Sequence, residues 1–339
     1  MAPTSLLQRC AANPILQESD IPWDCMSVFN AGIAKWDGEY VMLFRTDSGP
    51  KATPDARLTR VGLARSQDGI KWDVDPEPVF DQKIACEWLK DQYHERFGEK
   101  EIFRIYDPRI TLIDGEAYFC FAFDTIHGVR GGIAKCSSKC LRKWELLSLS
   151  LPENRNMVMF PERINGKLYR LDRPFPIYSK GWQEMFDIWI SESVDGKYWG
   201  ESRLVLGAEE VPFTNGKIGP GAPPLKTDKG WLTTFHAVHI DKENPLQGWE
   251  PKSWCKEYVS GLMLLDLNDP SRVIGISKQP LLRAEAPYEI EGFRGSVIFP
   301  GGFLLEEDGT VKMYYGAADT VVALAEGTLE SLLSAIEPI

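Results

Sequence analysis

The sequence predicts an all-β protein, a five-bladed β-propeller with a short C-terminal helix. Five times an Asp-Gly or Asn-Gly turn, or a close variant, runs directly into an aromatic-rich strand; the glycines of these turns are Gly38, Gly115, Gly166, Gly230 and Gly309. Such turns favour tight hairpins, because their central residues need the positive φ that glycine and asparagine tolerate. The intervals between the glycines are 77, 51, 64 and 79 residues, which is too irregular for a solenoid but compatible with four-stranded blades that carry unequal loops.

A second turn follows the first in three of the predicted blades. The segments 66–72, 137–144 and 193–199 each begin with a serine and end with a tryptophan, and the first follows an alternating stretch of small or apolar and polar residues. Alternation of this kind has the period of a half-buried strand. Each blade is therefore expected to consist of two hairpins.

A propeller makes one domain, because its blades share an axis and cannot bury their faces alone. We expect residues 1–339 to form this single domain, with an N-terminal extension over about residues 1–12. Residues 87–100 are charged and residues 241–256 are rich in Pro and Trp, so both are predicted to be insertions. Apolar residues recur at helical spacing over residues 328–336, which predicts a terminal helix that caps the fold without a chemical role.

The composition limits the partners of the protein. A formal net charge of -11 argues against a general nucleic-acid or anionic-membrane surface, so an anionic substrate would need a local basic pocket. The seven cysteines show no Cys-x-x-Cys pairing, and with the four histidines they show no metal-ligand spacing; no metal or organic cofactor is predicted. The absence of a long apolar segment predicts a cytoplasmic protein with reduced thiols.

The first chemical motif is Tyr106-Asp107-Pro108-Arg109, which precedes a predicted inner strand. A carboxylate beside a conformationally fixed proline can be a positioned proton donor. The alternative is an ordinary Asp-Pro turn in which Arg109 forms a structural ion pair.

Basic residues form the second set of candidates. Arg155 and Asn156, and then Arg173, flank one predicted hairpin, and guanidinium groups there suit phosphate or carboxylate. A Gly- and Pro-rich loop fixes Lys217, and His236 follows in a predicted strand. The alternatives are surface arginines that balance an acidic chain and a hydrogen-bonded structural histidine.

The last motif joins an aromatic strand to an acid. Tyr314 and Tyr315 are followed by small residues and Asp319. Sugar sites often combine an aromatic face with carboxylates that accept hydroxyl hydrogens, although the tyrosines can equally be core residues.

Taken together, these motifs resemble one family. The ordered set comprises Val28-Phe29-Asn30, Phe44-Arg45, Asp68-Gly69 with Trp72, Tyr106-Asp107-Pro108-Arg109, Asn154-Arg155-Asn156, Phe160-Pro161, Ile164-Asn165-Gly166-Lys167, Arg173-Pro174, Lys217-Ile218-Gly219 and Tyr315-Gly316-Ala317-Ala318-Asp319-Thr320. From about Asn13 to the C-terminus the chain resembles glycoside hydrolase family 130, mainly β-mannoside phosphorylases on a five-bladed propeller.

The resemblance implies a role for each matching residue. Asp107 corresponds to the catalytic acid, which is proposed in the family to pass its proton through the 3-hydroxyl of the mannosyl unit. The resemblance implies that Arg155, Asn156, Arg173, Lys217 and His236 bind inorganic phosphate, and that Asn30, Arg45 and Asp319 hold the mannosyl unit. Tyr106 and Arg109, which flank Asp107 and Pro108 in the same motif, are expected to contact substrate.

The resemblance implies inverting phosphorolysis of a β-mannoside, such as a manno-oligosaccharide or a mannosyl-glucose or mannosyl-N-acetylglucosamine, that releases α-mannose 1-phosphate. Phosphate is itself an anionic nucleophile, so one acid suffices, whereas an inverting hydrolase needs a second carboxylate as base. The alternatives are a β-mannosidase that uses Glu162, Asp172 or Asp187, and a carbohydrate-binding propeller without activity. A homo-oligomer could form through the N-terminal segment or the terminal helix.

The chain departs from the usual family pattern at three places. Ala31 replaces a common serine, Gly301 replaces a frequent cysteine, and the segment 291–296 differs in character. These differences, with the two predicted insertions, are expected to affect the sugar accepted on the leaving-group side.

Overall fold

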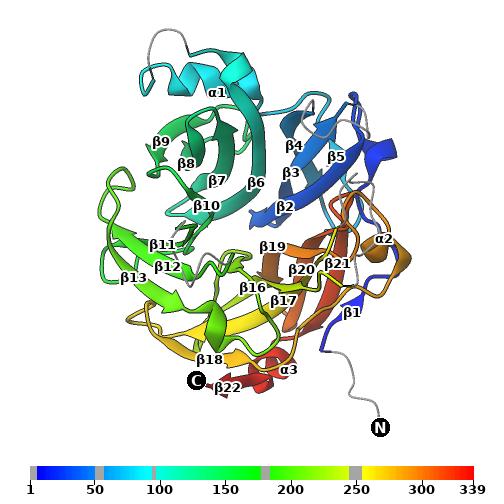
Figure 1. Cartoon of the computed structure of the whole chain (residues 1–339), viewed down its shortest axis with the longest axis vertical. Coiled ribbons are helices and arrows are strands. Elements are labelled where there is room, and N and C mark those ends of the chain that lie inside the picture. The colour runs from blue at the N-terminus through cyan, green and yellow to red at the C-terminus, as the bar shows by residue number, and fades with distance from the viewer. Residues whose placement is uncertain (1–5, 50–56, 94–96, 177–183, 244–253) are drawn as a thin grey trace.

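The computed structural model describes residues 6–49, 57–93, 97–176, 184–243 and 254–339. These residues form five antiparallel sheets arranged around a common centre (Figure 1). Each sheet is one blade, which confirms the predicted five-bladed β-propeller.

In each blade the strands follow one another from the propeller axis to the outer edge. Blade one contains β2 (Ser27–Trp36), β3 (Glu39–Ser48), β4 (Leu58–Ser66) and β5 (Asp73–Val74). Blade two contains β6 (Ile102–Ile113), β7 (Glu116–Thr125), β8 (Gly128–Cys136) and β9 (Glu145–Leu149). Blade three contains β10 (Asn154–Met159), β11 (Leu168–Pro174), β12 (Ile188–Ser193) and β13 (Gly200–Leu206).

In blade four the innermost strand is split into β14 (Ile218–Pro220) and β15 (Leu225–Thr227), and both pieces pair with β16 (Gly230–Ile240). This blade continues with β17 (Lys256–Leu265) and β18 (Val273–Ser277). Blade five contains β19 (Ile298–Leu305), β20 (Thr310–Ala317) and β21 (Val321–Thr328).

Both ends of the described chain join these sheets. The short strand β1 (Gln8–Arg9) pairs with β21 and becomes the outermost strand of blade five. The C-terminal strand β22 (Ile336–Pro338) pairs with β18 of blade four. Gln8 and Arg9, from near the N-terminus, thereby close the ring of blades.

The five turns from which the fold was predicted all join an innermost strand to the second strand of its blade. In blades one to three both turn residues have positive φ, as at Asp37 (50°) and Gly38 (85°). The segments 66–72 and 193–199, predicted as second turns, also form hairpin turns. In them the Ser66 hydroxyl accepts a hydrogen bond from the Gly69 amide, and the Ser193 hydroxyl accepts one from the Gly196 amide, both at 2.8 Å. The sequence therefore located both hairpins of these blades.

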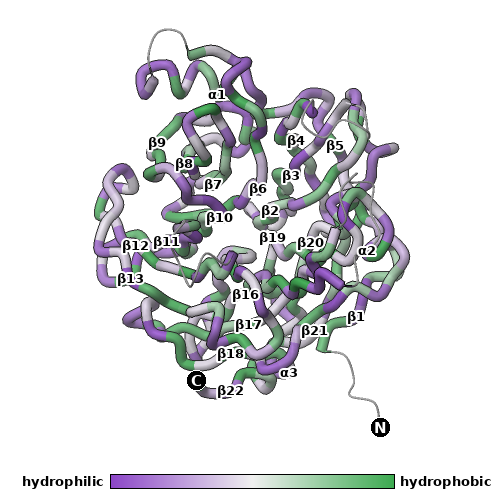
Figure 2. Tube along the Cα trace, in the orientation of Figure 1, coloured by the Kyte–Doolittle hydropathy of each residue, from purple (hydrophilic) through white to green (hydrophobic). Residues whose placement is uncertain are grey.

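The hydrophobic core is divided among the five blade interfaces. Within the described residues, five buried clusters each combine side chains from two neighbouring blades. Figure 2 shows hydrophobic segments in the strands of every blade. Since each cluster needs two blades, the ring is stabilised as a unit.

The helices are short and peripheral. They are α1 (Gln82–Leu89), α2 (Pro287–Ile290) and α3 (Leu329–Ser334), with single 3₁₀ turns at Glu18–Asp20, Glu99–Glu101 and Ala208–Glu210. The predicted C-terminal helix is confirmed as α3, which buries Leu332; Ile336, expected at its end, belongs to β22.

The predicted insertion at 87–100 begins in α1, which buries Ala85 and Leu89 beside blades one and two. Residues 94–96 of this insertion, and residues 244–253 of the second one, lie outside the described part of the chain.

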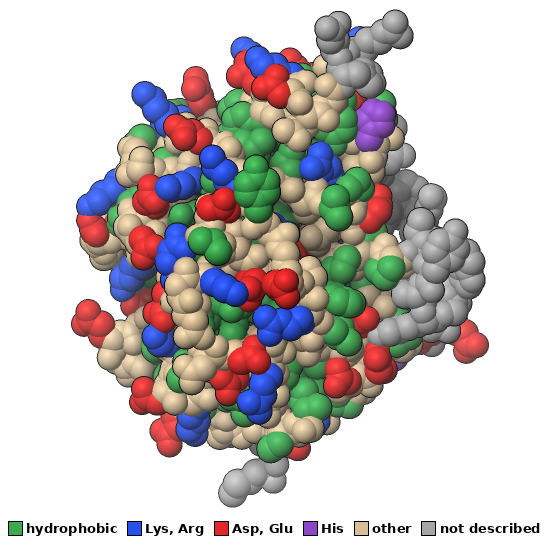
Figure 3. Space-filling view, turned by 90° about the vertical axis from the view of Figure 1, so that its left-hand side faces the viewer, with side chains coloured by type: hydrophobic (Ala, Val, Ile, Leu, Met, Phe, Trp, Pro, Cys, Tyr) green, Lys and Arg blue, Asp and Glu red, His purple; other side chains and the backbone are tan. Residues whose placement is uncertain are grey.

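No helix in the described segments is long and apolar enough to cross a membrane. All seven cysteines are free thiols. On the side of the molecule shown in Figure 3, basic and acidic side chains are intermixed over the blades.

Candidate active site

Three innermost strands break their register at a similar depth. The breaks lie between Phe29 and Gly32 in β2, between Tyr106 and Arg109 in β6, and between Arg155 and Val158 in β10. At the breaks Asn30, Asp107 and Asn156 adopt positive φ of 50°, 54° and 56°. A bulge re-aims the side chain of its extra residue. Asn and Asp suit such positions because they tolerate the left-handed conformation.

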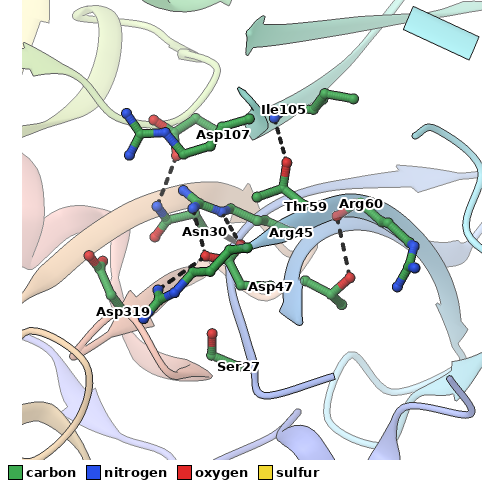
Figure 4. Close-up of polar contacts among 12 residues, drawn as sticks. Ser27, Asn30, Arg45, Asp47, Thr59, Arg60, Ile105, Asp107 and Asp319 are labelled. Carbon is green, nitrogen blue, oxygen red and sulfur yellow. Dashed lines mark hydrogen bonds and ion pairs between the residues drawn. The ribbon is translucent and has the colours of Figure 1, made fainter. Parts of the chain in front are cut away.

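These bulges bring the three side chains together. The Asn30 Nδ2 donates to Asp107 Oδ1 at 2.9 Å, and the Asn156 Nδ2 donates to Asp107 Oδ2 at 3.0 Å. Figure 4 shows Asn30 directed toward Asp107. Each carboxylate oxygen keeps a further lone pair for another partner. Amides from two neighbouring blades thus fix the carboxylate of Asp107.

Asp107 lines a small, polar cavity of about 80 Å³. Of the eleven predicted site residues, the nine that line it are Asn30, Arg45, Tyr106, Asp107, Arg155, Asn156, Arg173, His236 and Asp319. They come from all five blades. The structure therefore brings together residues that are separated by up to 289 positions in the sequence.

The cavity is strongly basic although the protein is acidic. Its lining contains five arginines but only two aspartates. Arg45 is offset by a bidentate pair with Asp47, at 2.6 and 2.8 Å (Figure 4). Arg155 and Arg173 have no carboxylate partner among the described residues, and they lie directly opposite each other on β10 and β11. Like charges in such a cross-strand pair repel each other, so an anion between them would be stabilised.

The pKa values of Arg173 and His236 reflect this excess of positive charge. Burial and the neighbouring Arg155 lower the pKa of Arg173 to about 9. Burial, with the positive charges of Arg173 and Arg109, lowers the pKa of His236 well below its usual value, so the imidazole is neutral at pH 7. Arg173 Nε and Nη2 and His236 Nδ1 are buried without hydrogen-bond partners. Unpaired buried donors of this kind are costly, and an oxyanion would satisfy them.

Lys217 lies beside this cluster but does not line the cavity. Its Nζ is 3.4 Å from Glu184, whose carboxylate also binds Lys256 at 2.6 Å. Burial and the charges of Arg173 and Arg155 lower the pKa of Lys217. Burial would raise the pKa of Tyr258, but the positive charges of Lys217 and Arg294 reverse the effect and lower it.

Arg109 occupies a different position from the one expected. It is fully buried and lies outside the cavity lining. Its guanidinium donates to three backbone carbonyls, those of Pro108 (2.9 Å), Gly221 (2.5 Å) and Pro300 (3.2 Å). Arg109 therefore ties blade two to blades four and five beneath the site. Arg109 was expected to contact substrate, and its position gives it a structural role instead. The alternative role was also structural, as one half of an ion pair, but the guanidinium binds carbonyl groups.

A second cavity, of about 400 Å³, adjoins the first. The two share Arg45, Arg104, Arg294 and Asp319. The remaining residues that line the second cavity are Phe29, Asp47, Arg57, Phe103, Asp124 and Phe293. Its volume and its mixture of aromatic and charged side chains suit a small polar ligand.

The sequence comparison decides the family. The model of glycoside hydrolase family 130, described as β-1,4-mannooligosaccharide phosphorylase, matches residues 9–337. The chain belongs to this family.

Its relatives in family 130 match over nearly the whole chain. A 1,2-β-oligomannan phosphorylase of Thermoanaerobacter sp. (strain X514) is 33% identical over 323 residues, which cover 94% of this chain and 96% of the relative. A β-1,2-mannobiose phosphorylase of Listeria innocua is 30% identical and covers 98% of both chains. The solved complex of the β-1,2-mannobiose phosphorylase from Listeria innocua with β-1,2-mannobiose superposes with a TM-score of 0.79 at 28% identity, and covers 97% of this chain and 99% of that one.

One departure from the usual family 130 pattern has a packing explanation. A Cβ at position 301 would overlap the carbonyl oxygen of Ala31 in the bulge of β2, so Gly301 is required by the close approach of β19. Ala31 is itself fully buried. The third departure, the segment 291–296, contributes Phe293 and Arg294 to the second cavity.

Six residues that line the first cavity were not among the predicted site residues: Arg104, Trp254, Tyr258, Arg294, Val297 and Phe299. Trp254 and Arg294 do lie in the segments 241–256 and 291–296, which were expected to affect the leaving-group sugar. A signal existed for Arg104, which lies two residues before Tyr106 and so on the same face of β6. The others precede or occupy strands in blades four and five, and only the fold brings them to the axis. Conversely, Tyr314 and Tyr315 are core residues whose hydroxyls bond to the Gly69 carbonyl and to Glu289.

Proposed function

We propose that this chain is an inverting phosphorylase that cleaves a β-mannoside with inorganic phosphate and releases α-mannose 1-phosphate. The observation that carries the proposal is a pair of cations, Arg155 and Arg173, that have no carboxylate partner among the described residues and lie beside the fixed carboxylate of Asp107. The relatives named above are phosphorylases of β-mannosides, which supports the same reaction class.

Asp107 is the proton donor in this proposal. A phosphate oxygen forms the new bond to the anomeric carbon while the glycosidic bond breaks. The departing oxygen receives a proton, which comes from Asp107 by way of the 3-hydroxyl of the mannosyl unit. Arg155, Arg173 and Lys217 neutralise the phosphate and hold it in line for attack. Neutral His236 and the amide of Asn156 add hydrogen bonds.

The sugar lies on the other side of Asp107. Asn30, Arg45 and Asp319 hold the mannosyl unit, and the second cavity receives the leaving-group sugar. There Phe103 and Phe293 offer apolar faces to the sugar ring. The cavity, at about 400 Å³, lies within the range of roughly 300–1,000 Å³ that is usual for small-molecule sites.

The hydrolytic alternative is less well supported. Of the carboxylates considered as its base, Glu162 pairs with Lys226 at 2.5 Å on the surface. Asp172 is bonded to Arg170 and Ser191, and Asp187 accepts a hydrogen bond from the Ala208 amide. None of the three lines either cavity.

The proposal is tested by the dependence of turnover on phosphate. With a β-mannobiose panel of β-1,2, β-1,3 and β-1,4 linkages, we expect α-mannose 1-phosphate to appear only when inorganic phosphate is present. Free mannose released at equal rates in phosphate-free buffer would establish a mannosidase instead. Calorimetric binding of the sugar without turnover at any phosphate concentration would establish a binding protein. The reverse reaction, with α-mannose 1-phosphate and a panel of acceptor sugars, then identifies the leaving group.

We expect kcat/KM for phosphate to fall as the pH becomes alkaline, and to do so at a lower pH than that at which an ordinary lysine loses its charge. The pKa of Lys217 is lowered by burial and by Arg173 and Arg155. Raising the pH through this pKa removes a cation, while deprotonation of Tyr258 adds an anion, so both changes weaken phosphate binding. In Lys217→Arg the alkaline limb of the pH profile of kcat/KM for phosphate should therefore move to higher pH. An unchanged alkaline limb in both Lys217→Arg and Tyr258→Phe would contradict this assignment.

The proposal names inorganic phosphate as co-substrate and no metal or organic cofactor. Residence in the cytoplasm and a homo-oligomeric state stay predictions, which fractionation and light scattering can check.

A further inference from the structure

Asp124, near the end of β7, lies between the two cavities. It is 6% exposed and lines the second cavity. The Tyr106 hydroxyl donates to its Oδ1 at 2.5 Å, and Arg104 Nε donates to its Oδ2 at 2.8 Å. Both oxygens of Asp124 are therefore engaged by side chains that line the first cavity.

The Tyr106 hydroxyl connects Asp124 to Arg155. A phenol has one proton to donate and lone pairs with which to accept. Because the proton points to Asp124, a lone pair can face Arg155, whose Nη1 donates to the Tyr106 oxygen at 3.1 Å. Burial raises the pKa of Tyr106, so the hydroxyl keeps its proton. Among the described residues Asp124 alone accepts a hydrogen bond from the Tyr106 hydroxyl, so Asp124 sets the direction of this proton.

Arg155 depends on this contact for its orientation. Its guanidinium lies over the rings of Tyr106 and Phe175, at 5.7 and 5.4 Å from their centroids, and stacking of this kind leaves the group free to turn in its plane. The bond to Tyr106 removes that freedom and uses one of five N–H donors. The remaining donors are then available to an anion beside Arg173.

We propose that Asp124 is a positioning residue for phosphate: it orients the Tyr106 hydroxyl, which in turn orients Arg155. The inference rests on the proposed function, in which Arg155 binds phosphate. The inference also explains the Arg104–Asp124 pair, in which Arg104 holds the Asp124 carboxylate from the side of the second cavity.

Replacement of Asp124 by Asn should disturb the chain of bonds whichever way the amide points. If the amide oxygen faces Tyr106, the NH₂ group meets the donor Arg104. If the oxygen faces Arg104, the NH₂ group meets the Tyr106 hydroxyl, whose proton must then turn toward the donor Arg155. Each arrangement contains two opposed donors. The first loses the Arg104 contact that holds the side chain at position 124, and the second turns the Tyr106 proton toward Arg155, so in both the orientation of Arg155 is less firmly fixed.

The test measures the Kd of inorganic phosphate by calorimetry, with the KM of phosphate and of the mannoside, in Asp124→Asn, Tyr106→Phe and the double variant. We expect each single substitution to weaken phosphate binding about three- to tenfold, as for one hydrogen bond. The mannoside KM should change little in Tyr106→Phe, because Tyr106 does not line the second cavity. Because both substitutions act through one chain of contacts, the double variant should bind phosphate no more weakly than the single variant that has the larger loss.

The matched control is Glu289→Gln. Glu289 is fully buried, and its Oε1 accepts from the Tyr315 hydroxyl at 2.7 Å and from Arg9 Nε at 2.8 Å, so it also joins a tyrosine to an arginine, outside both cavities. Its replacement should lower stability and leave the phosphate Kd unchanged.

Effects of Asp124→Asn and Tyr106→Phe that multiply, or an equal loss for mannoside and phosphate in Tyr106→Phe, would overturn the inference. If Asp124→Asn fails to fold, an unchanged phosphate Kd in Tyr106→Phe overturns it equally. Wild-type protein without phosphate-dependent turnover would instead refute the proposed function, while the phosphate Kd values still decide the role of Asp124.

Discussion

Asp107→Asn is expected to lower kcat for phosphorolysis about 10³-fold or more, because an amide cannot supply the proton that the departing oxygen needs. The substitution preserves shape and tolerates the positive φ of 54° at this position. It also places one NH₂ group against Asn30 or Asn156, both of which are donors to Asp107. Initial rates with saturating phosphate and mannoside measure the loss.

Asp114→Asn is the matched control. Asp114 also has a positive φ, of 53°, but it occupies the turn between β6 and β7, and among the described residues it pairs with Arg163, at 3.2 Å on the surface. A surface pair of this kind contributes about 0–1 kcal/mol, so the control should keep wild-type turnover. Substantial activity in Asp107→Asn with a folded propeller would remove Asp107 from the reaction.

Arg173→Met is expected to have opposite effects on function and stability. Phosphate binding should weaken by two to three orders of magnitude, because loss of a buried charge-assisted partner costs about 2–5 kcal/mol. The phosphate-free protein should become more stable by about 1 kcal/mol or more, because burial and Arg155 already lower the pKa of Arg173 to about 9 and no carboxylate of the described residues pairs with it. Thermal unfolding with and without phosphate measures both effects.

Arg170→Met separates this result from a general effect of removing a buried arginine. Arg170 lies on the same strand, β11, but pairs with Asp172 at 3.0 Å outside both cavities. Breaking that pair should destabilise the protein by about 3 kcal/mol and leave the stabilisation by phosphate intact. If phosphate raises the Tm of Arg173→Met as much as that of the wild type, Arg173 is not a phosphate ligand.

The turns carried most of the fold information. Local preferences at Asp37-Gly38 and its counterparts mark the hairpins, because positive φ is a property of the residues themselves. The same local preference, Asn or Asp at positive φ, underlies the bulges at Asn30, Asp107 and Asn156. The roles expected for these three rested on family resemblance, and the bulges supply the physical basis for their convergence.

The roles of the arginines were not readable in the same way. Arg109 and Arg173 look alike in the sequence, each beside a proline and an acidic motif. Arg109 is held by carbonyls of blades four and five, whereas Arg173 faces the cavity with unpaired donors. Which partners surround a long side chain depends on segments more than 100 residues away.

The sequence by itself determined the number of blades and the positions of their hairpins, since these follow from backbone preference, whereas the residues expected to bind phosphate and sugar rested on family resemblance. Only the tertiary structure decided which cations remain unpaired, that Arg109 is structural, and that Asp124 connects the two cavities. Charge pairing and burial depend on distances across the axis, and these arise only when all five blades close into a ring.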